Sequence, residues 1–243
     1  MKRAVNCGLV KADNMKQAIL LLSFGTPRQP SDLLPYLTSI RRGKIPTERE
    51  LKVLTARYDA IGQWDNKLLQ TMGEEQKKTL KSLLAIDAMY LAYLHMPNSM
   101  EQAIESIATA GYTSILCIVT SPFYSMIGTG AYERKLHSIL RAYPDISCEI
   151  IKSWWNRPQF FEYWRSQLMA ANPLQADTAC IFSAHSVPTS TVGSYEDEVM
   201  SASNQIAKMV GLNHWYQAWQ SAAPYGEWLG PTIESVIDRK SVV

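Results

Sequence analysis

"AILLLSFGTP", residues 18–27, is an apolar run that ends in a glycine–threonine–proline turn. An unbroken run of apolar residues predicts a strand that is buried on both faces, and Gly25 and Pro27 are typical of the turn that follows such a strand. Similar runs recur along the chain. We expect strands at residues 18–24, 89–94, 114–120, 148–151, 178–183 and 215–220.

Amphipathic stretches lie between these runs, which is the sequence pattern of βα units around a parallel sheet. Two of the predicted helices begin with capping-box pairs, Thr47 with Glu50 and Ser99 with Gln102. Pro158 suits the first turn of another helix. The sequence therefore predicts an α/β fold.

The predicted strands are unevenly distributed, because four precede residue 152 and only two follow it. A two-stranded sheet does not bury enough apolar surface to be stable alone. Either the second half packs as an appendage, or the chain stops before its second domain is finished. We expect an N-terminal domain at residues 1–152 and an incomplete second domain at residues 153–243.

The composition narrows the classes of partner. The chain is 47% hydrophobic with a net charge of only +2, which argues against a nucleic-acid surface. No signal-peptide pattern is visible, and no apolar run reaches the ~20 residues that span a bilayer. We therefore expect a cytoplasmic protein without a transmembrane segment. The cysteines are widely spaced and form no CxxC pair, so we expect reduced thiols at Cys7, Cys117, Cys148 and Cys180.

Two histidines follow apolar runs, and ligands of open α/β sheets bind at the carboxyl ends of the strands. His185 lies in "CIFSAHSVP" between small residues, and His95 lies in "YLHMP". His185 suits a metal ligand or a general base, and a structural histidine is the alternative. The absence of an HExxH or GxSxG motif argues against a conventional zinc enzyme and an α/β-hydrolase.

Arginines and tyrosines are the other candidates for ligand binding. Arg41 and Arg42 in "IRRGK" are either a solvated pair or a clamp for carboxylates, which guanidinium groups bind in a bidentate manner. Arg57 and Tyr58 lie together in "TARYDAIG", near the end of a predicted helix. Tyr132 ends the glycine-containing stretch "SPFYSMIGTGAY", which we expect to contain a flexible polar loop around Gly128 and Gly130.

Taken in order, these segments resemble the ferrochelatase family, whose members insert Fe²⁺ into a porphyrin. The combination of "FSAHSVP" with "WQSAAPYGEWLGP" is specific, and the similarity covers nearly the whole chain. The pattern "IRRGKIP" followed by "ARYDAIG" looks most like the enzymes of Gram-positive bacteria, whose substrate is coproporphyrin III. The resemblance implies two Rossmann-like, chelatase-type domains with parallel four-stranded sheets flanked by helices, of which the second is incomplete here.

The resemblance also implies roles for individual residues. His185 would be the iron-site ligand and the acceptor of pyrrole protons, and His95 matches another histidine of the family. Arg41, Arg57, Tyr58 and Tyr132 would contact the porphyrin or its propionates. Fe²⁺ and porphyrin would be substrates in haem biosynthesis, with no permanently bound cofactor, and we expect a monomer.

Three departures from the family pattern affect the expected porphyrin site. Phe24 stands where many Gram-positive members have a tyrosine that can ligate iron. Gln63, Trp64 and Asp65 replace a glycine and a Ser-Pro-Leu turn, and Asp65 would place a negative charge beside the propionates. The ending "DRKSVV" does not resemble the family's continuation, which carries an acidic residue opposite the catalytic histidine.

These departures leave three functional hypotheses open. The first is a coproporphyrin ferrochelatase. The second is a porphyrin- or haem-binding remnant in which insertion is impaired because the acidic residue is missing. The third is a chelatase of the same fold that inserts cobalt or nickel into a different tetrapyrrole.

Overall fold

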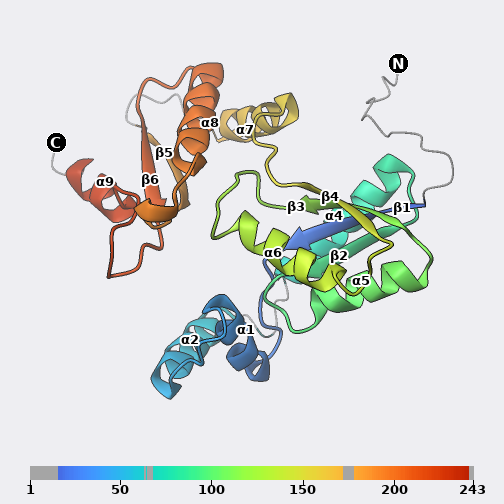
Figure 1. Cartoon of the computed structure of the whole chain (residues 1–243). Helices are drawn as coiled ribbons and strands as arrows, with labels where there is room; N and C mark the ends of the chain where they lie inside the picture. The colour runs from blue at the N-terminus through green and yellow to red at the C-terminus, as the bar shows by residue number, and fades with distance from the viewer. Residues whose placement is uncertain (1–15, 63, 65–67, 172–177, 241–243) are drawn as a thin grey trace, which may run out of the picture. The chain divides into compact units, whose positions relative to one another are not determined.

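The structure is a computed structural model that describes residues 16–62, 64, 68–171 and 178–240. The chain divides into two compact units, and each is described by itself. The first unit comprises the residues up to 118 together with residues 135–150, and the second comprises residues 119–134 together with those from 151 onward (Figure 1). The predicted domain boundary at residue 152 stays a prediction.

The first unit is an α/β unit with a parallel four-stranded sheet in the order β2-β1-β3-β4. β1 pairs with β2 in parallel from Ile19 opposite Met89 to Ser23 opposite Tyr93. The four strands are β1 (Gln17–Ser23), β2 (Met89–Tyr93), β3 (Ser114–Val119) and β4 (Ser147–Ile151). The strands predicted in the first half of the chain are therefore confirmed, with ends that differ by one residue at most.

Helices accompany this sheet, as Figure 1 shows. α4 contributes Leu80 to a cluster around Ile19, Leu21 and Met89, and α5 buries an apolar face that includes Ile104. The central strand β1 is buried on both faces, as its unbroken apolar run predicts. The helices and the short 3-10 turn are η1 (Pro30–Asp32), α1 (Leu33–Ile40), α2 (Glu48–Ala60), α4 (Leu68–Leu84), α5 (Ser99–Thr109) and α6 (Thr129–Leu140).

Of the two predicted capping boxes, one is confirmed and one is wrong. Thr47 accepts a hydrogen bond from the Glu50 amide, and the Glu50 carboxylate accepts one from the Thr47 amide. At α5 the N-cap is Asn98, whose side chain forms no capping hydrogen bond. The Ser99 hydroxyl instead accepts a hydrogen bond from the Tyr93 amide at 3.0 Å, so a contact with the end of β2 replaces the local cap.

The second unit contains a two-stranded parallel sheet of β5 (Cys180–His185) and β6 (Trp215–Gln220). Pro158 opens α7, as predicted, and Gly211 ends α8 in the left-handed conformation. The remaining elements of this unit are α7 (Pro158–Ala170), η2 (Thr189–Thr191), α8 (Tyr195–Val210) and α9 (Ile233–Lys240).

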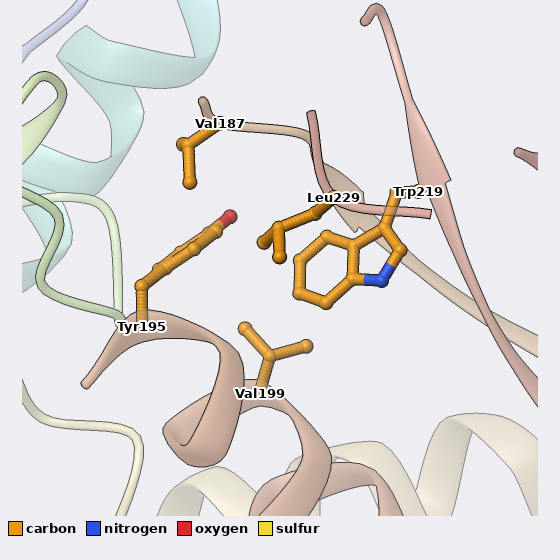
Figure 2. Packing of buried hydrophobic residues seen from close by; sticks show 5 residues of the cluster. All are labelled: Val187, Tyr195, Val199, Trp219 and Leu229. Atoms are coloured by element: carbon orange, nitrogen blue, oxygen red, sulfur yellow. The ribbon is translucent and has the colours of Figure 1, made fainter. Parts of the chain in front are cut away.

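The core of the second unit joins segments that are far apart in the sequence. Tyr195 and Val199 of α8 pack with Trp219 of β6 and with Val187 and Leu229 (Figure 2). Trp219 is only 2% exposed. A second cluster, formed by α7 and α8, contains Phe161, Ala202, Ile206 and Val210.

The prediction for β5 needs correction in two respects. The strand runs from Cys180 to His185 and not from residue 178 to 183, because its backbone stays paired with β6 as far as Gln220. Its apolar run is also not fully buried. Ile181, Ser183 and His185 are exposed, and because they alternate along the strand they lie on one of its two faces. Among the described residues, no helix is both long and apolar enough to cross a membrane.

Candidate functional site

His185 is the last residue of β5, and its backbone is held from two sides. The amide of the next residue, Ser186, donates to the Gln220 carbonyl at 2.8 Å, which continues the pairing with β6. The Tyr195 hydroxyl donates to the His185 carbonyl at 3.0 Å. Burial raises the pKa of Tyr195 to about 12, so this hydroxyl keeps its proton at neutral pH. The position of the histidine at the strand end is therefore fixed by its main chain.

The imidazole ring of His185 is available for chemistry. The residue is exposed, and within the described part of the chain no side chain forms a hydrogen bond or ion pair with the ring. Partial desolvation lowers its pKa below the ordinary 6.5. The ring is thus neutral near pH 7, and it can accept a proton or donate a lone pair to a soft or borderline metal ion.

The segments after β5 and β6 are joined directly. The buried Ser186 hydroxyl donates to the Leu229 carbonyl at 2.9 Å, and the Leu229 amide donates to the Val187 carbonyl at 3.1 Å. Pro188 forms an isolated bridge with Trp228. The sequence motifs "SAHSVP" and "WLGP" are therefore held together by hydrogen bonds directly after His185.

His95, the second predicted histidine, lies in an aromatic cluster of the first unit. Its ring centroid lies 4.4 Å from that of Phe24, and Tyr36 of α1 lies at 6.3 Å from His95 and 6.4 Å from Phe24, all in edge-on geometry. The Ser39 hydroxyl lies 2.9 Å from His95 Nδ1. Desolvation, with a smaller contribution from the Lys135 ammonium, lowers the pKa of His95 to about 4. This histidine is neutral and internally partnered.

Phe24 and Gly25 directly follow β1, and Phe24 is the member of this cluster that comes from the β1 turn. Phe24 is 48% exposed, so its ring covers one side of His95 and leaves its own outer face open. Gly25 has a φ of +89°, and a Cβ at this position would approach Met96 Cγ to 2.9 Å. Glycine is therefore required here both by its backbone conformation and by its packing.

Arg41 forms an ion pair with Glu50, which joins the end of α1 to the start of α2. The same Glu50 oxygen accepts hydrogen bonds from the Thr47 amide and hydroxyl, at 2.7 and 2.9 Å. The Thr47 backbone contact first and Arg41 second lower the pKa of Glu50 to about 2. Arg41 already binds one carboxylate, and a guanidinium fork retains further N–H donors for another.

Arg57 and Tyr58 lie at the far end of α2 from Glu50. Arg57 is exposed in the last turn, and Tyr58 packs edge-on against Trp64 with centroids 5.4 Å apart. Arg57 follows Glu50 by seven residues, which is about 10 Å along a helix axis. Arg41, beside the start of α2, and Arg57, near its end, therefore lie at different positions along this helix. Asp65, also predicted to line the site, lies outside the described residues.

The expected loop before Tyr132 is found at residues 121–128, but it ends earlier than predicted, because α6 begins at Thr129. The Ser125 hydroxyl accepts a hydrogen bond from the Gly128 amide at 3.0 Å, and the buried Thr129 hydroxyl donates to the Phe123 carbonyl at 2.8 Å. Tyr132 lies in this helix and is only 5% exposed, and burial raises its pKa. Tyr132 thus packs inside the protein, as far as this structure describes it.

Several supporting residues were not predicted. Tyr195 fixes the His185 carbonyl, Tyr36 and Ser39 enclose His95, and Glu50 holds Arg41. Only Glu50 carried a sequence signal, since it belongs to the capping box. Over the residues described, no group of three or more His, Cys, Asp or Glu side chains is arranged to hold a metal ion.

Comparisons with known proteins identify the relatives of this chain. The model of the ferrochelatase family matches residues 16–241. Coproporphyrin III ferrochelatase from Staphylococcus aureus strain Mu50 is 30% identical over 236 residues, which cover 91% of this chain and 76% of the relative. The enzyme of the same name from Halalkalibacterium halodurans is also 30% identical, over 91% of this chain and 75% of the relative.

Solved structures of chelatases share the fold. SirB from Bacillus subtilis with Fe³⁺ matches with a TM-score of 0.57 and 12% identity, over 93% of this chain and 71% of SirB. The sirohydrochlorin chelatase SirB from B. subtilis subspecies spizizenii, in complex with cobalt, matches with a TM-score of 0.53 and 11% identity, over 84% and 67% of the two chains. The fold and the family match agree, and the chain belongs to the ferrochelatase family of metal-inserting enzymes.

Proposed function

We propose that this protein inserts Fe²⁺ into coproporphyrin III, with His185 as the group that accepts pyrrole protons and contacts the incoming metal. Insertion exchanges two N–H protons of the macrocycle for one dication, so the reaction needs a nearby base. The observation that carries the proposal is the His185 ring, which is exposed, has a lowered pKa and meets no hydrogen-bonding side chain among the described residues, on a backbone fixed by Gln220 and Tyr195. The 30% identity to coproporphyrin III ferrochelatases supports the choice of substrate.

The lowered pKa of His185 favours this role. A neutral imidazole does not repel a dication, and it keeps a lone pair for a proton or for iron. Because its pKa lies below 6.5, insertion would fall only when the pH drops below that value. Near pH 7 the neutral form of the ring would therefore predominate.

Arg41, Arg57 and Tyr58 would hold the porphyrin in this proposal. The two guanidinium groups are suited to propionates, and because Arg41 pairs with Glu50 at the start of α2 and Arg57 lies in its last turn, they could bind different substituents of one macrocycle. Tyr132, being buried, would support the binding surface from inside and would not contact the ring directly.

The test is insertion by the purified protein under anaerobic conditions, with coproporphyrin III and Fe²⁺, followed by the Soret band. His185→Ala should abolish insertion and change porphyrin affinity by less than about tenfold, or ~1.4 kcal/mol. His214→Ala is the matched control, because His214 is also an exposed histidine of the second unit. Full turnover by His185→Ala would remove this histidine from the mechanism.

A second candidate function is porphyrin or haem binding without insertion. The observation that favours it is that the residues proposed to bind porphyrin and the residue proposed to accept protons belong to different units. Arg41, Arg57 and Tyr58 lie in the first unit and His185 in the second. Binding could therefore survive when insertion is impaired. In the same assay, quenching of porphyrin fluorescence without a Soret shift would select this candidate. Repeating the assay with Co²⁺ and Ni²⁺ and other tetrapyrroles tests whether the protein is a chelatase for another metal.

A further inference from the structure

Cys117 and Cys148 form a close pair of thiols in the first unit. Their Sγ atoms lie 3.6 Å apart, and both cysteines are free. Cys117 lies in β3 and is completely buried, whereas Cys148 lies in β4 and is only partly buried. Because β4 is the edge strand of the sheet, one thiol of the pair is within reach of small solutes.

The two thiols differ in acidity as well as in exposure. The hydrogen bond between the two thiols lowers the pKa of Cys148. The same hydrogen bond, together with burial, raises the pKa of Cys117. Since the thiolate is the reactive form of cysteine, Cys148 is the nucleophile of the pair and Cys117 the thiol beside it.

The register of the strands limits how the two sulfur atoms can meet. The Ser147 amide donates to the Thr113 carbonyl at 2.9 Å. In parallel strands this hydrogen bond places Cys148 opposite Ile115. Cys117 lies two residues beyond Ile115 on the same face of the sheet, so it is a diagonal neighbour of Cys148. Diagonal Cα atoms of neighbouring strands lie about 7–8 Å apart, slightly beyond the usual range for a disulfide. Bond formation would therefore require a small shift of the edge strand β4, and the product would be strained and easily reduced.

We propose that Cys148 and Cys117 are a peroxide-reactive pair that forms a reversible disulfide. The Cys148 thiolate attacks one oxygen of a hydroperoxide, the O–O bond breaks, and Cys148 becomes a sulfenic acid. The Cys117 sulfur then attacks the Cys148 sulfur and displaces water. For hydrogen peroxide the balance is two thiols and one peroxide giving one disulfide and two water molecules. A small thiol reverses the reaction by exchange.

The location gives this modification a structural consequence. The chain leaves the first unit after Ile118 in β3 and again after Ile150 in β4. Both cysteines lie within a few residues of these two crossings. A disulfide would tie together the two strands through which the chain passes into the second unit. This inference does not depend on the proposed function.

The experiment treats the full-length protein with hydrogen peroxide, blocks the remaining thiols with an alkylating reagent in denaturant, and maps the cysteine peptides by mass spectrometry. We expect a Cys117–Cys148 disulfide that removes two of the four alkylatable thiols and is reversed by dithiothreitol. In Cys117→Ser, dimedone should trap a sulfenic acid at Cys148. Cys180→Ser, which leaves the pair intact, should still form the disulfide.

Two outcomes would overturn the inference. One is complete alkylation of both Cys117 and Cys148 after peroxide treatment of the wild-type protein. The other is a stable dimedone adduct on wild-type Cys148 without any disulfide. Both are measured on the unmodified sequence, so a folding defect of a variant does not affect them.

Discussion

Acidification should destabilise the first unit through His95. This residue has a pKa of about 4 in the folded protein, and its ordinary value is 6.5. Between these values the unfolded chain binds more protons than the folded one, so the stability that neutral His95 provides is complete above about pH 6.5 and is lost as the pH falls toward 4. Integrating this difference from about pH 8 to about pH 5 gives a loss of about 2 kcal/mol in the free energy of unfolding.

The assay compares urea unfolding of the wild-type protein and His95→Gln at these two pH values. Glutamine does not titrate, and its amide can still hydrogen-bond the Ser39 hydroxyl. The variant should therefore lose about 2 kcal/mol less stability on acidification than the wild type. The other three histidines are present in both proteins, so their contributions cancel.

Proton NMR of the histidine rings measures the cause directly. The resonance that disappears in His95→Gln should titrate near pH 4 in the wild type. Lys135→Gln is a second control, and it should raise the pKa of His95 while leaving it below 6.5, because desolvation has the larger effect. A wild-type His95 that titrates near 6.5, or an equal loss of stability in wild type and His95→Gln, would refute the reasoning.

Three further predictions concern single contacts. Gly25→Ala should lower the free energy of unfolding in urea by more than Gly43→Ala does. Both glycines have a positive φ, which costs an alanine about 1–3 kcal/mol, but only the Cβ at residue 25 would also clash with a neighbour. Equal losses in the two variants would contradict the clash at residue 25. Tyr195→Phe removes the hydroxyl that holds the His185 carbonyl, so we expect about 1 kcal/mol lower stability and a lower kcat for insertion with little change in porphyrin affinity. Trp219→Ala should destabilise the second unit by about 3–5 kcal/mol, and Trp215→Ala, at a more exposed position of the same strand, by less in the same unfolding assay.

The elements that could be predicted from sequence are those whose patterns are local. β1 is an unbroken apolar run because it is buried on both faces, and Thr47 with Glu50 caps α2 through contacts within four residues. Predictions failed where a residue far away in the sequence forms the deciding hydrogen bond. Ser99 binds the Tyr93 amide, and β5 extends to His185 because its backbone pairs with Gln220.

In the candidate site, too, features set by local sequence could be predicted and features set by distant residues could not. The position of His95 after a strand could be predicted, and His185 lies at a strand end as its apolar run indicated, although inside β5 and not after it. Their environments could not, because Tyr36, Ser39 and Tyr195 come from other segments and carry no motif. The burial of Tyr132 likewise depends on the hydrogen bonds that start α6.

Residues 119–134 belong to the second unit but are synthesised before most of it, since they lie between two segments of the first unit. Phe123 packs against Trp155, Phe160 and Tyr195, and the last of these follows it by 72 residues. At about 5–20 residues per second, Phe123 waits roughly 4–14 s for Tyr195 to be made. During that interval the aromatic segment that follows β3 has no complete core to enter. The nascent chain is therefore most exposed to aggregation at this stage, before α8 has emerged.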